Sequence, residues 1–168
     1  MSVAVARGTV AFVVGDVLRD ALVRPGGVVG HLVFGEDDGD NPELARLAID
    51  GSPATAWHTQ WYAAATFGNL KPGTGLLLDM GRPVTITSAQ IMLGAMTGAD
   101  YQPRAGGEPV LADLRPAARA TAAGGLVTRR PARPATARYL LLWFTRLPPD
   151  SSGTFEAIAY DVRLHGIA

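Results

Sequence analysis

Glycine and proline interrupt this sequence so often that long helices have no room to form. The 168 residues contain 20 Gly and 12 Pro, and both residue types weaken or end a helix. The segments between them are short, apolar and rich in residues that favour an extended backbone. The strands that we expect are residues 75–80, 84–93, 117–122, 126–129, 138–144 and 157–165. Gly124 and Gly125 are expected to join the third and fourth of these as a hairpin, and the whole pattern predicts an all-β sandwich or barrel.

Composition narrows the class of protein further. A chain of this length fits one domain, and a hydrophobic content of 48% excludes a disordered tail. Fifteen basic residues balance fifteen acidic ones, which argues against a nucleic-acid binder because such proteins carry a basic excess. The cysteine count is zero, so disulfides, thiolate metal sites and cysteine nucleophiles are all excluded.

Residues 1–27 are expected to form an extension or linker, and residues 28–168 the domain proper. The apolar stretch 3–14 is broken at Arg7 and Gly8, so it is too short for a bilayer span of about 20 apolar residues. It also lacks the order of charge, apolar run and cleavage site of a signal peptide. Residues 16–24 predict a short amphipathic helix that ends at Pro25. We therefore expect no membrane insertion by this chain and find no convincing signal peptide.

The next segment predicts a short helix preceded by an acidic loop. Asn41 is placed to cap this helix and Pro42 to occupy its first position. The acidic run 36–40 is expected to be solvated, because it lacks the spacing of a calcium-binding helix–loop–helix.

Four segments carry a resemblance to a known family. Residues 48–57 read AIDGSPATAW and resemble the A-I-D-G-x-x-x-T-x-W signature of discoidin-like domains. Residues 75–81, 137–141 and 158–166 are similar, in the same order, to three further strands of that family. Discoidin-like domains are galactose-binding-like jelly rolls that include coagulation-factor type C domains and many carbohydrate-binding modules. The resemblance implies a jelly-roll β-sandwich of about eight antiparallel strands.

The resemblance also implies a function and a setting. Residues 57–77 look most similar to discoidin-like domains at the extracytoplasmic carboxyl end of actinobacterial membrane proteins, including kinase-like and flippase fusions. We therefore expect a non-catalytic module that binds carbohydrate or a cell-envelope glycan in an extracytoplasmic assembly. The alternative is a protein-interaction or spacer domain of a membrane-anchored signalling protein.

An enzyme finds little support in the sequence. No nucleophile-elbow, zinc-protease or phosphate-loop motif is present, and the three histidines lie in unrelated segments. A glycosidase needs two carboxylates that face each other across a cleft. The sequence gives no way to pair its candidate acids, which we expect to be ordinary surface or turn residues: Asp79, Asp100, Glu108, Asp113 and Glu156.

Aromatic residues give the clearest indication of a binding surface. Trp61, Tyr62 and Phe67 lie in a stretch rich in Ala and Gly that reads as a long loop. Such rings form a platform for the apolar face of a sugar, or alternatively plug the open end of the sandwich. The candidate ligand-binding residues are His58, Gln60, Trp61, Tyr62 and Arg104. By contrast, Trp57, Trp143 and Phe144 are expected to be core.

The loop that begins at Asp50 is a candidate metal site. In many discoidin-like domains the matching loop binds a structural calcium ion, and the resemblance implies ligands from Asp50, Ser52, Thr55 and Asp161. The last of these is an Asp where the family usually has Glu. Calcium takes six to eight oxygens, so backbone carbonyls would complete the shell. The alternative is a loop closed only by hydrogen bonds from Asp50 and Thr55.

Overall fold

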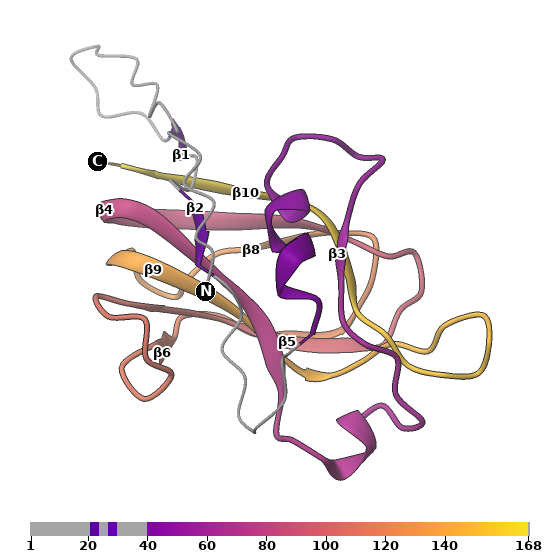
Figure 1. Ribbon diagram of the computed structural model, residues 1–168. Coiled ribbons are helices and arrows are strands. Elements are labelled where there is room, and N and C mark those ends of the chain that lie inside the picture. Colours follow the sequence, from indigo (N-terminus) through magenta and orange to yellow (C-terminus); the bar gives the residue numbers. More distant parts are fainter. Residues whose placement is uncertain (1–20, 24–26, 30–39, 168) are drawn as a thin grey trace.

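The computed structural model describes residues 21–23, 27–29 and 40–167, and within them it contains ten strands and two short 3-10 helices (Figure 1). The strands are β1 (Ala21–Val23), β2 (Gly27–Val29), β3 (Trp57–His58), β4 (Thr74–Leu93), β5 (Ala99–Gly106), β6 (Arg115–Pro116), β7 (Ala120–Ala123), β8 (Leu126–Arg129), β9 (Ala135–Arg146) and β10 (Ile158–Ile167). The 3-10 helices are η1 (Pro42–Ala48) and η2 (Phe67–Asn69). All strand pairs are antiparallel. The predicted all-β jelly-roll sandwich is therefore confirmed.

Strand β4 joins the two layers of the sandwich. The sequence predicts two strands here, but the structure has one strand of 20 residues. It bends near Gly81, whose φ of 77° suits glycine, and its pairing with β9 shifts register between Asp79 and Val84. Its first part pairs with β9 and its last part with β10 and β8 (Figure 1). One strand thus contributes to both layers.

The hydrophobic core lies between the layers. Leu76 and Leu142 from one layer and Ile91 and Leu164 from the other are fully buried in a single cluster. A second cluster lies on the outer face of the first layer and contains Leu77, Leu114, Tyr139, Leu141 and Trp143. The prediction that Trp57, Trp143 and Phe144 are core residues is confirmed, because each is at most 5% exposed.

The predicted hairpin around Gly124 and Gly125 is wrong. Strand β7 pairs with β5, whereas β8 pairs with β4, so the two glycines carry the chain from one layer to the other. Their connection is tied to the end of β4, because the amide of Gly125 donates to the carbonyl oxygen of Gly94 (2.8 Å) and the amide of Leu93 donates to the carbonyl oxygen of Gly125 (2.9 Å). A Cβ on Gly124 would lie 2.6 Å from the carbonyl oxygen of Met96, which explains why glycine is needed at this close approach.

The described residues of the amino-terminal segment, 21–23 and 27–29, form strands, so the predicted helix is wrong for residues 21–23. Ala21–Val23 is a strand antiparallel to β10, and Gly27–Val29 pairs with β4. The rest of the predicted helix, and the acidic residues before Asp40, lie outside the described residues. The domain boundary near residue 27 remains a prediction. No helix within the described ranges is both long and apolar enough to cross a membrane.

Candidate functional site

A buried ion pair underlies the loops at one end of the sandwich. Asp40 is fully buried, so the prediction of a solvated loop is wrong for this residue. Its carboxylate accepts hydrogen bonds from Lys71 Nζ (2.5 Å), Tyr62 Oη (2.8 Å) and the backbone amide of Gln60 (2.9 Å). Lys71 is itself only 6% exposed in its side chain. The opposite charges and the additional hydrogen bonds offset the free-energy cost of removing both groups from water.

Aromatic rings enclose the same lysine. Lys71 Nζ lies 5.2 Å from the ring centre of Tyr62 and 5.8 Å from that of Phe67, within the range of a cation–π contact. The two rings meet edge to face, with their centres 5.3 Å apart. These contacts fix the loop of residues 59–70, which has little regular secondary structure of its own.

The ion pair sets the charge state of Asp40. Burial by itself raises the pKa of this carboxyl, but the hydrogen bonds from Lys71, Gln60 and Tyr62 outweigh it and hold the pKa below its usual value. A lowered pKa stabilises the folded state above the unfolded value of about 3.9. This contribution is lost as the pH falls through the lowered pKa.

Asn41 connects the ion pair to a second polar group. The sequence predicts that Asn41 caps the helix at Pro42, and η1 does begin there, but the side chain makes no cap hydrogen bond. Instead, its Nδ2 donates to the carbonyl oxygen of His58 (2.9 Å) and its Oδ1 accepts from Gln60 Nε2 (2.9 Å). Asn41 adopts a left-handed φ of 51°, which asparagine tolerates well. Its side chain thus holds two predicted ligand-binding residues side by side.

His58 also approaches a carboxylate from the loop before β10. Its Nδ1 lies 3.2 Å from Glu156 Oε1 and 2.9 Å from the carbonyl oxygen of Thr59. The side chains of His58 and Glu156 are 42% and 23% exposed, so both present polar atoms to solvent. Partial burial raises the pKa of Glu156, and positive charge on His58 opposes that rise. We call Asn41, His58, Gln60 and Glu156 the His58 cluster.

The three loop aromatics have different environments. Phe67 is buried and supports the packing alternative for this ring, and Tyr62 is half-buried over Lys71. Trp61, in contrast, is 67% exposed. An open hollow of about 480 Å³ lies on the same loop end, lined by Thr66, Phe67, Asn69, Leu70, Lys71, Pro72 and Thr145. The loop end therefore combines an exposed ring, a recess and the His58 cluster.

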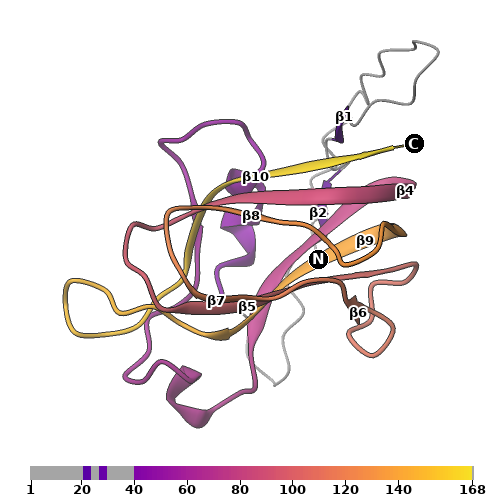
Figure 2. The same cartoon turned by 180° about the vertical axis from the view of Figure 1, so that it is seen from behind.

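Arg104 does not join this group. It lies on β5, where it pairs with Leu141 and with Pro116 of β6. In both views β6 lies well away from the loop that contains β3 (Figures 1 and 2). Of the five predicted ligand-binding residues, the structure gathers His58, Gln60, Trp61 and Tyr62 and separates Arg104.

Four residues of this end were missed as site residues: Asp40, Asn41, Lys71 and Glu156. One signal was available, since Lys71 is the only lysine in a chain whose other basic residues are arginines. A lone lysine in an aromatic loop points to a requirement for a compact point charge. Nothing in the sequence indicates its partner, which lies 31 residues away.

The Asp50 loop closes on itself. Asp50 Oδ1 accepts from the backbone amide of Ser52 (2.8 Å) and Oδ2 from the Thr55 hydroxyl (2.7 Å), and these bonds lower the pKa of Asp50. Asp161 lies on β10 with its carboxylate 2.6 Å from Arg163 Nε. No described contact joins Asp161 to the loop, and the described residues hold no cluster of three or more acidic, His or Cys side chains able to bind a metal. These hydrogen bonds are the ones that the hydrogen-bonded alternative expects, and calcium binding by the loop stays a prediction.

Comparison with known proteins identifies the fold. No family model matches the chain. Among solved structures, it is similar to a truncated AlyQ with CBM32 and alginate lyase domains (17% identity, TM-score 0.61), covering 89% of this chain and 35% of that one. It is also similar to the family 32 carbohydrate-binding module of Clostridium perfringens NanJ in complex with galactose (18% identity, TM-score 0.58), covering 88% and 99%. A third is chitosan-binding module 1 of a chitosanase/glucanase from Paenibacillus sp. IK-5 (18%, TM-score 0.57), covering 78% and 88%.

The chain has the fold of these modules. The discoidin-like, galactose-binding-like jelly roll that the motifs imply is confirmed, since the match spans nearly the whole length of the single modules. The chain spans only about a third of the two-domain AlyQ structure. At these identities the likeness establishes the fold.

Lys71→Met should destabilise the domain by about 3–5 kcal/mol, because it leaves the Asp40 carboxylate buried without its counter-charge. The matched control is Arg163→Met. That substitution breaks an ion pair of similar length, 2.6 Å, whose arginine is 55% exposed, and it should cost about 1 kcal/mol or less. Urea denaturation of both variants measures the difference. Equal costs would contradict the burial argument.

Asp50→Ala should lower stability by about 1 kcal/mol in the presence of a chelator, since it removes the hydrogen bonds from the Ser52 amide and the Thr55 hydroxyl in an exposed loop. Thermal melts of the wild type with calcium and with chelator should coincide. A calcium-dependent rise in Tm that disappears in Asp161→Asn would instead establish the shared ion that the family resemblance implies.

Proposed function

We propose that this protein is a non-catalytic module that binds a carbohydrate at the loop end of the sandwich. The observation that carries the proposal is the exposure of Trp61, which directly follows Gln60 of the His58 cluster in the chain. This combination suits a neutral sugar, because one face of the sugar ring is apolar and packs on an aromatic ring while its hydroxyls need hydrogen-bond partners.

We infer a role for each group. Trp61 supplies the flat apolar surface. His58 and Glu156 offer a donor and an acceptor to sugar hydroxyls, and Gln60 is fixed through Asn41. Asp40 and Lys71 lie behind these groups and set the path of the loop. The comparisons support carbohydrate binding in general, because the similar structures include modules in complex with galactose and with 4,5-unsaturated mannuronic acid.

The carboxylates at this end support binding in place of catalysis. Glycoside hydrolysis needs an acid and a second carboxylate on opposite sides of the sugar. Asp40 is sealed from solvent by its ion pair, and Glu156 remains accessible. Asp150, whose charge acts on Glu156, is held by hydrogen bonds from Ser152 and Thr154. Asp79, elsewhere in the molecule, is held by both Nε and an Nη of Arg138 at 2.8 and 2.9 Å.

We further propose an extracytoplasmic setting, with a cell-envelope glycan as ligand and the module as part of a larger assembly. The family resemblance supports this setting, and the AlyQ structure provides an example of such a module next to a second domain. A protein-interaction surface is the second candidate, favoured by Leu70, which is 80% exposed at the edge of the hollow.

Trp61→Ala should weaken glycan binding at least about fivefold and leave Tm nearly unchanged, because an exposed ring contributes to the ligand contact and little to the core. The measurement is a glycan array with the wild type, followed by calorimetry with the best ligand. Leu126→Ala is the matched control, since Leu126 is 58% exposed on β8, and it should bind as the wild type does. An array without any signal, together with capture of a protein through Leu70, would favour the second candidate.

A further inference from the structure

The neutral net charge conceals a strong segregation of charge along the chain. Residues 114–149 contain seven arginines and no acidic residue, whereas the whole chain has fifteen of each sign. The seven are Arg115, Arg119, Arg129, Arg130, Arg133, Arg138 and Arg146. Two of them have acidic neighbours. Arg138 forms an ion pair with Asp79, and Arg146 lies opposite Asp100 in the pairing of β9 with β5.

The fold brings the other five together. Arg129 Nε donates to the carbonyl oxygen of Arg119 (3.1 Å), and the amide of Ala132 donates to the carbonyl oxygen of Ala117 (3.4 Å). The segments 115–119 and 129–133 therefore run side by side, and both are seen on the side of the molecule that Figure 2 presents. We call Arg115, Arg119, Arg129, Arg130 and Arg133 the arginine face.

No carboxylate in the described part of the chain forms an ion pair with the arginine face. Arg129 donates only to backbone carbonyls, those of Arg119 and Thr128, and the other four side chains are exposed. Several arginines in one place repel one another, and a multivalent anion relieves that repulsion. The face therefore offers charge complementarity to a partner with repeated negative groups.

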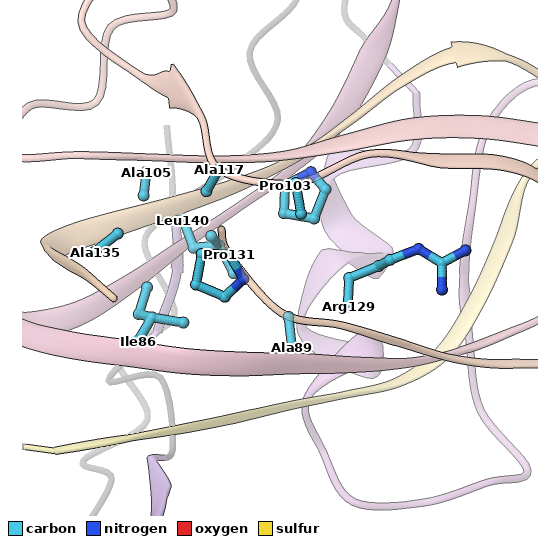
Figure 3. Close-up of a pocket in the computed structure, with 10 residues that line it drawn as sticks. Ile86, Ala89, Pro103, Ala105, Ala117, Arg129, Pro131, Ala135 and Leu140 are labelled. Atoms are coloured by element: carbon cyan, nitrogen blue, oxygen red, sulfur yellow. The ribbon is translucent and has the colours of Figure 1, made fainter. Parts of the chain in front are cut away.

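An apolar hollow beside the face limits the shape of that partner. It is lined by proline, alanine and leucine side chains such as Pro103, Pro131 and Leu140, with the stem of Arg129 at its edge (Figure 3). The guanidinium of Arg129 extends away from these apolar groups (Figure 3). The enclosed space is about 10 Å³, roughly that of one water molecule. A partner must therefore lie across this surface, because the hollow has no room for an inserted group.

We propose that the arginine face binds a polysaccharide that carries repeated carboxylate groups. Guanidinium forks match carboxylates with two parallel hydrogen bonds, and an extended polymer fits a surface without a deep pocket. Single-stranded nucleic acid is disfavoured, because residues 102–138 contain no aromatic residue on which bases could stack. This second site goes beyond the proposed function, since it shares no residue with the loop end.

The test measures binding of the full 168-residue chain to immobilised polygalacturonate at low ionic strength. Replacing three exposed arginines, as Arg115→Gln, Arg130→Gln and Arg133→Gln together, should weaken binding at least about tenfold. The matched control is Arg46→Gln, Arg146→Gln and Arg163→Gln, which makes the same change of net charge elsewhere and should bind within about twofold of the wild type. Fully methyl-esterified polygalacturonate, which lacks the charges, should not bind.

Three results would overturn the proposal. One is an equal loss of polygalacturonate binding in both triple variants, which would show that only the net charge of the protein matters. Another is no binding of polygalacturonate by the wild type. The third is equal binding of single-stranded DNA or polyglutamate through the same arginines, which would make the partner another polyanion. A neutral glycan found on the array serves as a separate readout, because its binding by the arginine variant reports on the loop end and on folding alone.

Discussion

The buried ion pair between Asp40 and Lys71 is the interaction on which the loop end of the molecule depends. Burial of either charge alone would be costly, so the two must meet and the remaining carboxylate lone pairs must be filled. Asp40 satisfies this by accepting from Lys71, Tyr62 and the amide of Gln60, while its own carbonyl oxygen accepts from the indole of Trp57 (2.8 Å). The signature tryptophan of the family motif and the candidate binding loop are thus tied to a single residue. Trp61 lies between two of these anchored positions with its ring in solvent.

The fold could be predicted because its signals are local and repeated. A continuous apolar run defines β9, alternating apolar residues define β10, and the AIDGSPATAW segment resembles the discoidin-like signature. The sequence-based predictions fail where a strand pairs with another strand that is distant in the sequence. The segment around Gly124 satisfies every local rule for a hairpin, yet its strands pair with β4 and β5 because the chain crosses between layers there.

The candidate site was predictable only in part for the same reason. His58, Gln60, Trp61 and Tyr62 are neighbours in sequence, so any loop that holds one of them keeps the others close. Asp40, Lys71 and Glu156 reach the same end from distant positions, and sequence alone does not show which acid meets which base. Arg104 was misplaced because nothing in one sequence indicates that β5 carries it away from the loop end.

The module combines two chemically different surfaces. The loop end has an exposed aromatic ring, partly buried polar groups and a neutralised ion pair, which suits a sugar bound by stacking and hydrogen bonds. The arginine face has no aromatic residue and a concentration of positive charge. Two sites on one rigid sandwich would bind one polymer more tightly than either site does alone, provided that the polymer spans both.

The central claim is that a glycan binds at Trp61, and the indole N–H signals of the protein test it most directly. The chain has three tryptophans: Trp57 is buried and hydrogen-bonded to Asp40, Trp143 is buried in the outer-face cluster, and Trp61 is exposed. Titration with the best glycan from the array, followed by ¹H–¹⁵N NMR, should move the Trp61 indole signal, assigned by its loss in Trp61→Phe, and leave that of Trp143 in place. Saturable binding that leaves the Trp61 signal unmoved would contradict the account.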